Sequence, residues 1–251
     1  IKGGDIVPVV KKLQKTTKEI IIINLLELSK EKVMLDITEM RTDLKMLSRI
    51  VKENAFKLHH TKSTAKNYAD LSKNRLSYED VMSLAGKKMD TSRRYNISFG
   101  KKETMPSIIE IDERLAFLLG VFVAEGNLER NMVNIACFNE EFAKEIIGSK
   151  PIWLKNSVRW HKKKKVLFCS KNLHEVIKLL DCGLIAKNKK IPEVIFQSPT
   201  TIKSKFLNGY FSGDGWVQPS GIYTLSKNRE LIEGLSLLLS EFGIYCKIKN
   251  K

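Results

Sequence analysis

Two stretches of the chain, 89 residues apart, share one pattern of bulky apolar positions, small residues and a closing acid. They read LAFLLGVFVAEGN (115–127) and SKFLNGYFSGDGW (204–216). In each stretch two small residues are four positions apart, so they fall on one face of a helix. These pairs are Gly120 with Ala124, and Gly209 with Gly213. Small residues let two helix backbones approach closely, so the pattern predicts two helices packed on each other about a pseudo-two-fold axis.

The same spacing continues beyond these helices. Asn139 and Asn228 each stand between a strand-like run and a helix-like run, where asparagine suits the helix N-cap. The predicted strands are Val133–Cys137, Val158–His161 and Val166–Cys169 in the first unit, and Ile222–Leu225 and Ile244–Ile248 in the second. The predicted helices are 140–147 and 172–183 in the first unit and 230–242 in the second. Relative to the first unit, the second lacks its last hairpin strand and last helix.

The first 105 residues show a different pattern. A turn and a short strand are predicted at the start, and helical spacing dominates between 35 and 87. Ser77 with Asp80 resembles a capping box, and Gly86 is a plausible stop. Basic residues alternate with Tyr68, Tyr78 and Tyr95 in this region. Residues 31–105 are therefore interpreted as a mostly helical region that binds nucleic acid, with a solvated basic face as the alternative.

The net charge is the part of the composition that indicates a class of binding partner. The 251 residues carry 44 Lys and Arg against 28 Asp and Glu, a net charge of +16. Such an excess favours a polyanion, most commonly nucleic acid, unless it reflects a generally lysine-rich proteome. The longest apolar run, Ile20–Leu26, is too short to cross a membrane, and no signal-peptide pattern is present. We expect no membrane partner and a cytoplasmic, nucleoid-associated location in a prokaryote.

Cysteine, histidine and tryptophan add no separate site. The four cysteines have no zinc-binding spacing and are interpreted as small buried side chains in a reducing compartment. The histidines are isolated or adjacent in sequence, which disfavours a histidine metal site. Trp153, Trp160 and Trp216 are expected to pack in the core or at its rim.

The acids that close the two repeated stretches carry the candidate chemistry. Close packing of the helices would bring Glu125 and Asp214 together at one end of the pair. Two carboxylates at helix C-termini repel each other and oppose the helix dipole unless cations neutralise them. Carboxylates and carbonyls are hard ligands suited to Mg²⁺, which assists phosphodiester hydrolysis. The alternative is two unrelated surface acids.

At these residues the chain resembles a known family. LLGVFVAEG (118–126) and LNGYFSGDG (207–215) look like the two copies of the LAGLIDADG signature of homing endonucleases. KNKKIPEVI (187–195) resembles the lysine-x-isoleucine-proline block that precedes the second signature in intein-encoded, archaeal members. The departures are Val123 and Ser212 near the first aspartate of the name, and Glu in place of the first metal-binding acid.

The resemblance implies an α+β fold for residues 106–251. It contains two αββαββα repeats, 106–195 and an incomplete 196–251, in a monomer with internal pseudo-symmetry. Residues 1–30 are similar to the strand that leaves an intein splicing half. No Cys or Ser begins this chain and no His-Asn pair ends it, so we expect splicing not to be carried by these residues alone.

The resemblance also implies site residues. Glu125 and Asp214 would bind Mg²⁺, with Mn²⁺ as a substitute, and the backbone carbonyls of Ala124 and Gly213 would assist. Lys189 would position or polarise the hydrolytic water, and Lys190 is the alternative one residue away. A second lysine of the family would correspond to Lys247 or Lys249.

Curved sheets of the family lie in the DNA major groove, so double-stranded DNA with a long recognition site is the implied partner. The predicted DNA-binding residues are Arg159, His161, Lys163, Lys165, Lys190 and Lys247. A solvated hairpin tip is the alternative for 162–165. The leading hypothesis is a site-specific endonuclease that makes double-strand breaks. The alternatives are a catalytically silent maturase or transcription regulator, and a remnant that binds nothing.

Overall fold

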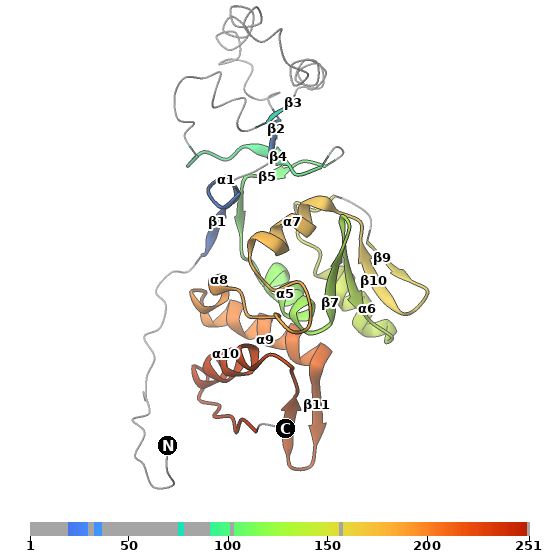
Figure 1. Ribbon diagram of the computed structural model, residues 1–251, viewed down its shortest axis with the longest axis vertical. Coiled ribbons are helices and arrows are strands. Elements are labelled where there is room, and N and C mark those ends of the chain that lie inside the picture. The colour runs from blue at the N-terminus through green and yellow to red at the C-terminus, as the bar shows by residue number, and fades with distance from the viewer. Residues whose placement is uncertain are drawn as a thin grey trace, which may run out of the picture.

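Two long helices pack against each other at the centre of the described chain (Figure 1). The computed structural model describes residues 20–29, 33–36, 75–77, 91–100, 103–155 and 158–249. The central helices are α5 (Glu113–Glu125) and α9 (Thr200–Asp214). A Cβ on Gly120 would lie 2.0 Å from the Phe206 carbonyl oxygen, and one on Gly209 would lie 2.2 Å from the Phe117 carbonyl oxygen. The predicted contact between helix backbones is therefore confirmed.

The first repeat has the order αββαββα. After α5 it contains β7 (Gly126–Glu129), β8 (Met132–Ala136), α6 (Glu140–Gly148), β9 (Val158–His161), β10 (Lys165–Phe168) and α7 (Lys171–Leu179). The four strands form an antiparallel sheet in the order β7-β8-β10-β9. Its buried side chains, including Val133 and Phe168, pack towards the helices. The α+β class and the first repeat are confirmed.

The second repeat copies the beginning of the first. A short helix, α8 (Glu193–Phe196), precedes α9, and then come β11 (Gly215–Gln218), β12 (Gly221–Thr224) and α10 (Arg229–Ser240). The two hairpins keep one register at the 89-residue offset: Asn127 lies opposite Asn134, and Trp216 lies opposite Tyr223. The pseudo-symmetry thus extends to individual strand pairs.

The predicted strand Ile244–Ile248 is wrong. Residues 244–249 are exposed and form no strand. At the 89-residue offset the end of this stretch corresponds to the start of β9, which in the first repeat pairs only with β10. The equivalent of β10 would fall beyond residue 251, and a strand without a pairing partner is not stable.

The two asparagines cap helices as predicted. Asn139 Oδ1 accepts from the Phe142 N–H at 2.9 Å, and Asn228 Oδ1 accepts from the Glu230 N–H at 3.0 Å. Each bond satisfies one backbone donor in the first turn of a helix.

The described part of the N-terminal region is mainly strand. It contains β1 (Ile22–Asn24), α1 (Leu25–Leu28), β2 (Met34–Asp36), β3 (Arg75–Ser77), β4 (Asn96–Ser98), β5 (Met105–Pro106) and β6 (Ile108–Glu110). The expected helical structure is therefore wrong at Leu35 and Leu76, because pairing in the sheet β3-β2-β4-β5 overrides local helical spacing. The predictions for residues 1–19, 37–74 and 78–90 lie outside the described residues.

This N-terminal sheet is joined to the first repeat by buried polar contacts. The Phe99 N–H donates to Asn172 Oδ1 at 2.9 Å, and Ser170 Oγ donates to Glu103 Oε2 at 2.6 Å. One hydrophobic cluster runs from β2 through α5 to α9 and α10. The contacts hold the N-terminal sheet away from the end of the helix pair where the acids lie (Figure 1).

The remaining side-chain predictions are confirmed in part. Cys137 and Cys182 are buried, but Cys246 is exposed because the segment that carries it lies outside the sheet. Trp153 and Trp160 pack against the core, whereas Trp216 is 43% exposed. None of the described helices has the length and apolar character needed to span a membrane.

Candidate active site at the end of the helix pair

The two predicted acids lie together where α5 and α9 end. A Cβ on Gly213 would lie 2.7 Å from the Ala124 Cβ and 3.1 Å from the Glu125 Cγ, so the last turns are in contact. Burial, with a smaller contribution from the charge of Asp214, raises the pKa of Glu125. Burial also raises the pKa of Asp214, and the charge of Lys189 partly offsets that rise. The carboxylates are thus half-buried and electrostatically coupled.

These features fit a divalent cation. Two coupled carboxylates are destabilised by loss of water, and a cation between them would remove that penalty. The last carbonyls of α5 and α9, including those of Ala124 and Gly213, have no partner within their helices by helix geometry. Within the described residues no group of three or more His, Cys, Asp or Glu side chains gathers. A site of two carboxylates, carbonyls and water is of the kind that Mg²⁺ accepts.

Lys189 enters this end of the helix pair as a buried cation. Its side chain is 4% exposed, and its Nζ donates to the Phe122 carbonyl at 2.8 Å. The same nitrogen lies 3.4 Å from the centroid of the Phe122 ring, a cation–π contact. Burial lowers the pKa of Lys189 to about 8, and the nearby charges of Cys182 and Asp214 raise it in part. The structure brings Lys189, Glu125 and Asp214 to one end of the helix pair.

Sequence reasoning missed the part that Phe122 plays. Its carbonyl accepts both from Lys189 and from the N–H of Gly126, the residue that ends α5. Phe122 and Lys189 are 67 positions apart in the sequence, and no local sequence pattern predicts their contact. The signal that was available is the aromatic residue three positions before each acid, at Phe122 and Phe211.

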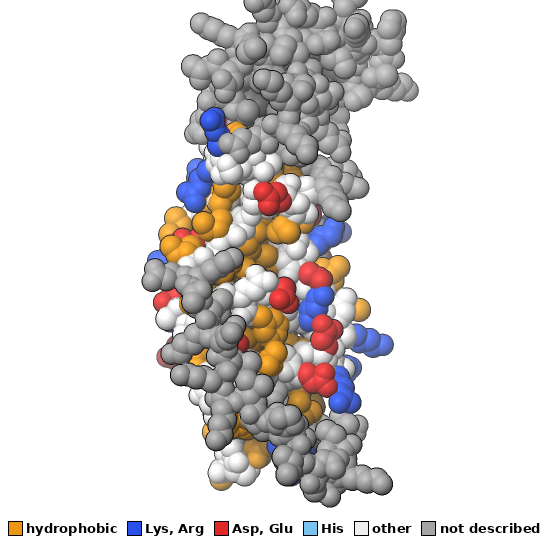
Figure 2. Space-filling view, turned by 90° about the vertical axis from the view of Figure 1, so that its left-hand side faces the viewer, with side chains coloured by type: hydrophobic (Ala, Val, Ile, Leu, Met, Phe, Trp, Pro, Cys, Tyr) orange, Lys and Arg blue, Asp and Glu red, His pale blue; other side chains and the backbone are white. Residues whose placement is uncertain are grey.

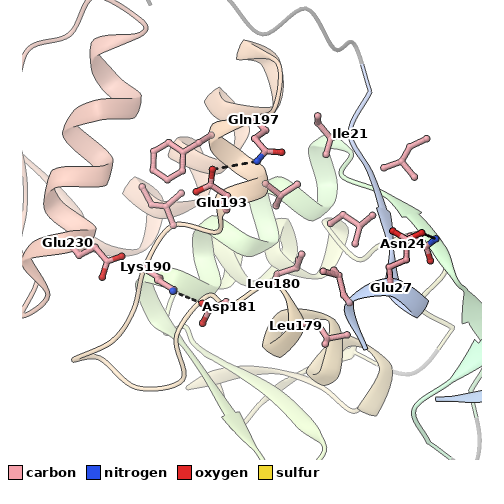
Figure 3. Close-up of a pocket in the computed structure, with 16 residues that line it drawn as sticks. Ile21, Asn24, Glu27, Leu179, Leu180, Asp181, Lys190, Glu193, Gln197 and Glu230 are labelled. Carbon is pink, nitrogen blue, oxygen red and sulfur yellow. Dashed lines mark hydrogen bonds and ion pairs between the residues drawn. The ribbon is translucent and has the colours of Figure 1, made fainter. Parts of the chain in front are cut away.

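Lys190 contacts a different acid from the two at the end of the helix pair. It forms an ion pair with Asp181, which raises the pKa of Lys190 (Figure 3). This pair lines a cavity of about 470 Å³ between β1, α1 and the segment 179–197. Neither Glu125 nor Asp214 lines that cavity. The geometry therefore favours Lys189 over Lys190 as the lysine beside the acids.

Three of the predicted DNA-binding residues share the outer face of the first sheet. His161 lies opposite Lys165, and Arg159 lies opposite Leu167, so all four point to the face away from the buried Val166 and Phe168. Lys163 lies in the turn between the strands, with a φ of +54°. Partial loss of water around the ring, together with the positive charges of Arg159, Lys162 and Lys165, lowers the pKa of His161.

The outer face of the second hairpin is aromatic. Trp216 and Tyr223 stack with ring centroids 5.8 Å apart, on the face opposite Thr224, whose side chain contacts Tyr210 of α9. The first repeat has Asn127 and Asn134 at these two positions. Lys247 and Lys249 lie in the exposed segment 244–249, outside this hairpin.

The positive charge is not spread evenly over the surface. On the face shown in Figure 2, acidic and basic side chains alternate along one edge, beside exposed hydrophobic side chains. Four consecutive lysines, 162–165, form the turn between β9 and β10 and the first position of β10.

The fold and the site define a protein built on two acid-ended helices that pack through small residues, with a sheet attached to each. A family model described as "LAGLIDADG-like domain" matches residues 201–251, which contain α9, β11, β12 and α10. This part of the chain is similar to that family, as its signature-like sequence indicated.

Proteins with three different named functions are similar to parts of this chain. A DNA polymerase of Thermococcus sp. (strain GE8) is 35% identical over 148 residues, covering 56% of this chain and 9% of the polymerase. A DNA-directed RNA polymerase subunit of Methanocaldococcus jannaschii is 27% identical over 157 residues, covering 59% of this chain and 18% of that protein. A probable translation initiation factor of the same organism is 41% identical over 63 residues, 24% of this chain and 6% of the factor. The chain thus spans less than a fifth of the length of each.

Proposed function

We propose that the chain is a metal-dependent DNA endonuclease of the intein-encoded type, which makes a site-specific double-strand break. The observation that carries the proposal is the meeting of Glu125 and Asp214 at the end of α5 and α9, with the buried ammonium of Lys189 beside them. Neither acid has a described role in holding the fold together, and both have raised pKa values because burial removes water from them. A costly arrangement of this kind is typical of a functional site.

The identities of the relatives support an inserted, self-contained module. A DNA polymerase, an RNA polymerase subunit and a translation initiation factor have different names and tasks, yet each matches this chain over a small share of its own length. A segment that occurs in unrelated hosts is expected of a mobile element, and a DNA-cutting activity provides the means of insertion. The proposed function thus covers a longer region than the family match at 201–251.

The residues at the end of the helix pair would have separate roles in metal binding and catalysis. Glu125, Asp214 and the carbonyls of Ala124 and Gly213 would hold Mg²⁺, or Mn²⁺ as a substitute, which supplies positive charge at the scissile phosphate and lowers the pKa of bound water. Lys189, held by the Phe122 carbonyl, would orient the attacking water and offset charge on the phosphate. Each acid would serve one DNA strand, since the two-fold arrangement of α5 and α9 matches that of a duplex.

DNA would lie across the outer faces of the two sheets. Arg159 and Lys165 on the first sheet suit phosphate or guanine contacts, and Lys163 at the turn suits phosphate. Lys190 and Lys247 remain candidates for further phosphate contacts. The chain would act as a monomer, because both halves of the site come from one chain.

The test is cleavage of long DNA that carries an archaeal DNA polymerase gene without an inserted segment, in Mg²⁺ and then in EDTA. We expect discrete double-strand ends that require Mg²⁺ and disappear in Asp214→Asn. Glu113→Gln, which changes an exposed acid at the opposite end of α5, should cut as the wild type does. Full cleavage by Asp214→Asn would refute the proposed site.

Binding without cleavage would favour the second function, a nucleic-acid-binding regulator or maturase on the same scaffold. It would appear as salt-dependent retention of DNA or RNA with no cut ends in either Mg²⁺ or Mn²⁺. No salt-dependent retention at all would leave only a structural remnant.

A further inference from the structure

Asn228, the N-cap residue of α10, also holds the backbone of Lys189. Its Nδ2 donates to the Lys189 carbonyl oxygen at 2.7 Å, while its Oδ1 accepts from the Glu230 N–H at 3.0 Å. One amide side chain therefore caps a helix of the second repeat and binds the segment that carries the lysine.

The segment needs such an anchor because it has no regular structure of its own. Residues 189–192 belong to no helix or strand. The Lys190 N–H donates to the Cys182 carbonyl at 3.2 Å, and the Lys189 Nζ donates to the Phe122 carbonyl at 2.8 Å. With the Asn228 bond, these contacts fix the segment to a loop of the first repeat, to α5 and to α10.

The geometry points to Asn228 as a positioning residue for Lys189, an inference that rests on the proposed nuclease function. Without the Nδ2 donor, the part-buried carbonyl of Lys189 loses this hydrogen bond, and the segment is left to contact α10 through Ile191, whose Cδ1 lies beside Gly234. The ammonium at the far end of that residue would then shift relative to Glu125 and Asp214. Shifts of about 1 Å in a catalytic group can cost on the order of 100-fold in rate.

The first repeat offers a matched control. Asn139 caps α6 through its Oδ1, as Asn228 caps α10. Among the described residues, no backbone carbonyl accepts from its Nδ2 in a comparable bond. Serine is as good an N-cap as asparagine, but it carries no amide donor that can reach the Lys189 carbonyl. Asn228→Ser therefore removes the anchor and keeps the cap, whereas Asn139→Ser changes a cap alone.

The first measurement is steady-state cleavage in Mg²⁺. We expect Asn228→Ser to lower kcat by about tenfold or more with KM within about twofold, because the DNA-contacting faces are unchanged. Asn139→Ser should retain both constants, and the two variants should lose similar stability. Wild-type kcat in Asn228→Ser would overturn the inference, and so would an equal loss in both variants.

The second measurement does not depend on cleavage. Amine acetylation with peptide mapping by mass spectrometry reports the exposure of each lysine in the free protein. Lys189 should be protected in the wild type and in Asn139→Ser, and should react about tenfold faster in Asn228→Ser, since one lost hydrogen bond eases local opening by that factor. Lys203, which is 2% exposed and paired with Glu241, is the internal control and should keep its protection in every variant.

The two measurements separate the possible failures. If the wild type cuts no DNA, the proposed function fails, whatever the labelling shows. If the wild type cuts DNA and Asn228→Ser either cuts at the wild-type rate or leaves Lys189 as protected as in the wild type, the anchoring role fails alone.

Discussion

The two repeats share the order helix, hairpin, helix and differ in the side chains that their equivalent positions carry. At the end of α5 the Phe122 carbonyl receives both the Gly126 N–H and the Lys189 ammonium. At the end of α9 the Phe211 carbonyl receives the Gly215 N–H, and no lysine of the described residues contacts it. The shared backbone keeps the two acids together, and the differing side chains make their surroundings unequal.

A second difference lies on the outer faces of the hairpins. At equivalent positions the first repeat presents Asn127 and Asn134, and the second presents the stacked pair Trp216 and Tyr223. The first repeat also presents Arg159, His161 and Lys165 on β9 and β10. Symmetry in the helix pair is thus a packing requirement, whereas the outer faces of the sheets carry different side chains.

The largest expected effect comes from removing the lysine that distinguishes the two helix ends. Lys189→Met keeps an apolar stem of similar length beside Phe122 but removes the charge. We expect cleavage to fall by about 100-fold or more, the usual contribution of a group that handles a proton or a charge in the transition state. Lys190→Met should cause a smaller loss, because its ammonium is paired with Asp181.

A single-turnover assay with saturating protein measures both variants under the same conditions. If Lys190→Met lowered the cleavage rate more than Lys189→Met, the assignment of Lys189 would be wrong, and Lys190 would be the lysine that acts in cleavage.

The next effect tests the feature in which the repeats agree. Gly120→Ala and Gly209→Ala each place a Cβ about 2 Å from a backbone oxygen of the other helix. Relief of this clash would require the two helices to move apart. We expect each to lower the free energy of unfolding by roughly 1–3 kcal/mol or more. Gly148→Ala, at the end of α6 with nothing within 4 Å, should be neutral or slightly stabilising. Urea unfolding measures all three, and a tolerated alanine at either central glycine would contradict close packing.

The sequence was sufficient for the features that repeat. The spacing of small residues predicted the contact of α5 with α9, the shared register predicted the pairing of Glu125 with Asp214, and position alone predicted the caps at Asn139 and Asn228. Each of these is a local pattern that occurs twice, so one copy checks the other.

The sequence was insufficient where structure depends on distant partners. The strands β7 and β11 follow directly from the glycines that end the helices and are too short to show a clear alternation. Leu35 was assigned to a helix because the sheet that pairs with it comes from residues 75–77 and 96–98. Ile244–Ile248 has strand-like composition but no neighbour to pair with. The contacts of Lys189 with Phe122 and Asn228 could not be found for the same reason.

A third effect follows from the burial of Lys189 in the cation-free protein. Its pKa is lowered from 10.5 to about 8 in the folded state. Between those values the unfolded chain binds more protons, so this residue makes the free energy of unfolding rise with pH. The penalty is fully present below about pH 8 and absent above 10.5. Wild type should therefore gain on the order of 1–3 kcal/mol relative to Lys189→Met across that window.

Urea unfolding at several pH values in EDTA gives this difference directly. Lys205→Met, at an exposed lysine of α9, is the control and should show no such trend. Parallel pH curves for wild type and Lys189→Met would mean that the ammonium is solvated.

The smallest expected effect compares the outer faces of the two hairpins in DNA binding. Arg159→Ala removes a charge suited to phosphate, so it should weaken binding by up to about tenfold and reduce the slope of log affinity against log salt by about 1. Trp216→Ala removes an uncharged contact and should weaken binding to a similar or smaller degree while leaving that slope unchanged. Val217→Ala, on the opposite face of the same strand, should bind as the wild type does.

Binding titrations at several salt concentrations in Ca²⁺ distinguish a variant that changes the salt dependence from one that changes the affinity alone. Equal slopes for Arg159→Ala and Trp216→Ala would mean that the repeats contact DNA in the same way, and the asymmetry of their side chains would then have no counterpart in the complex.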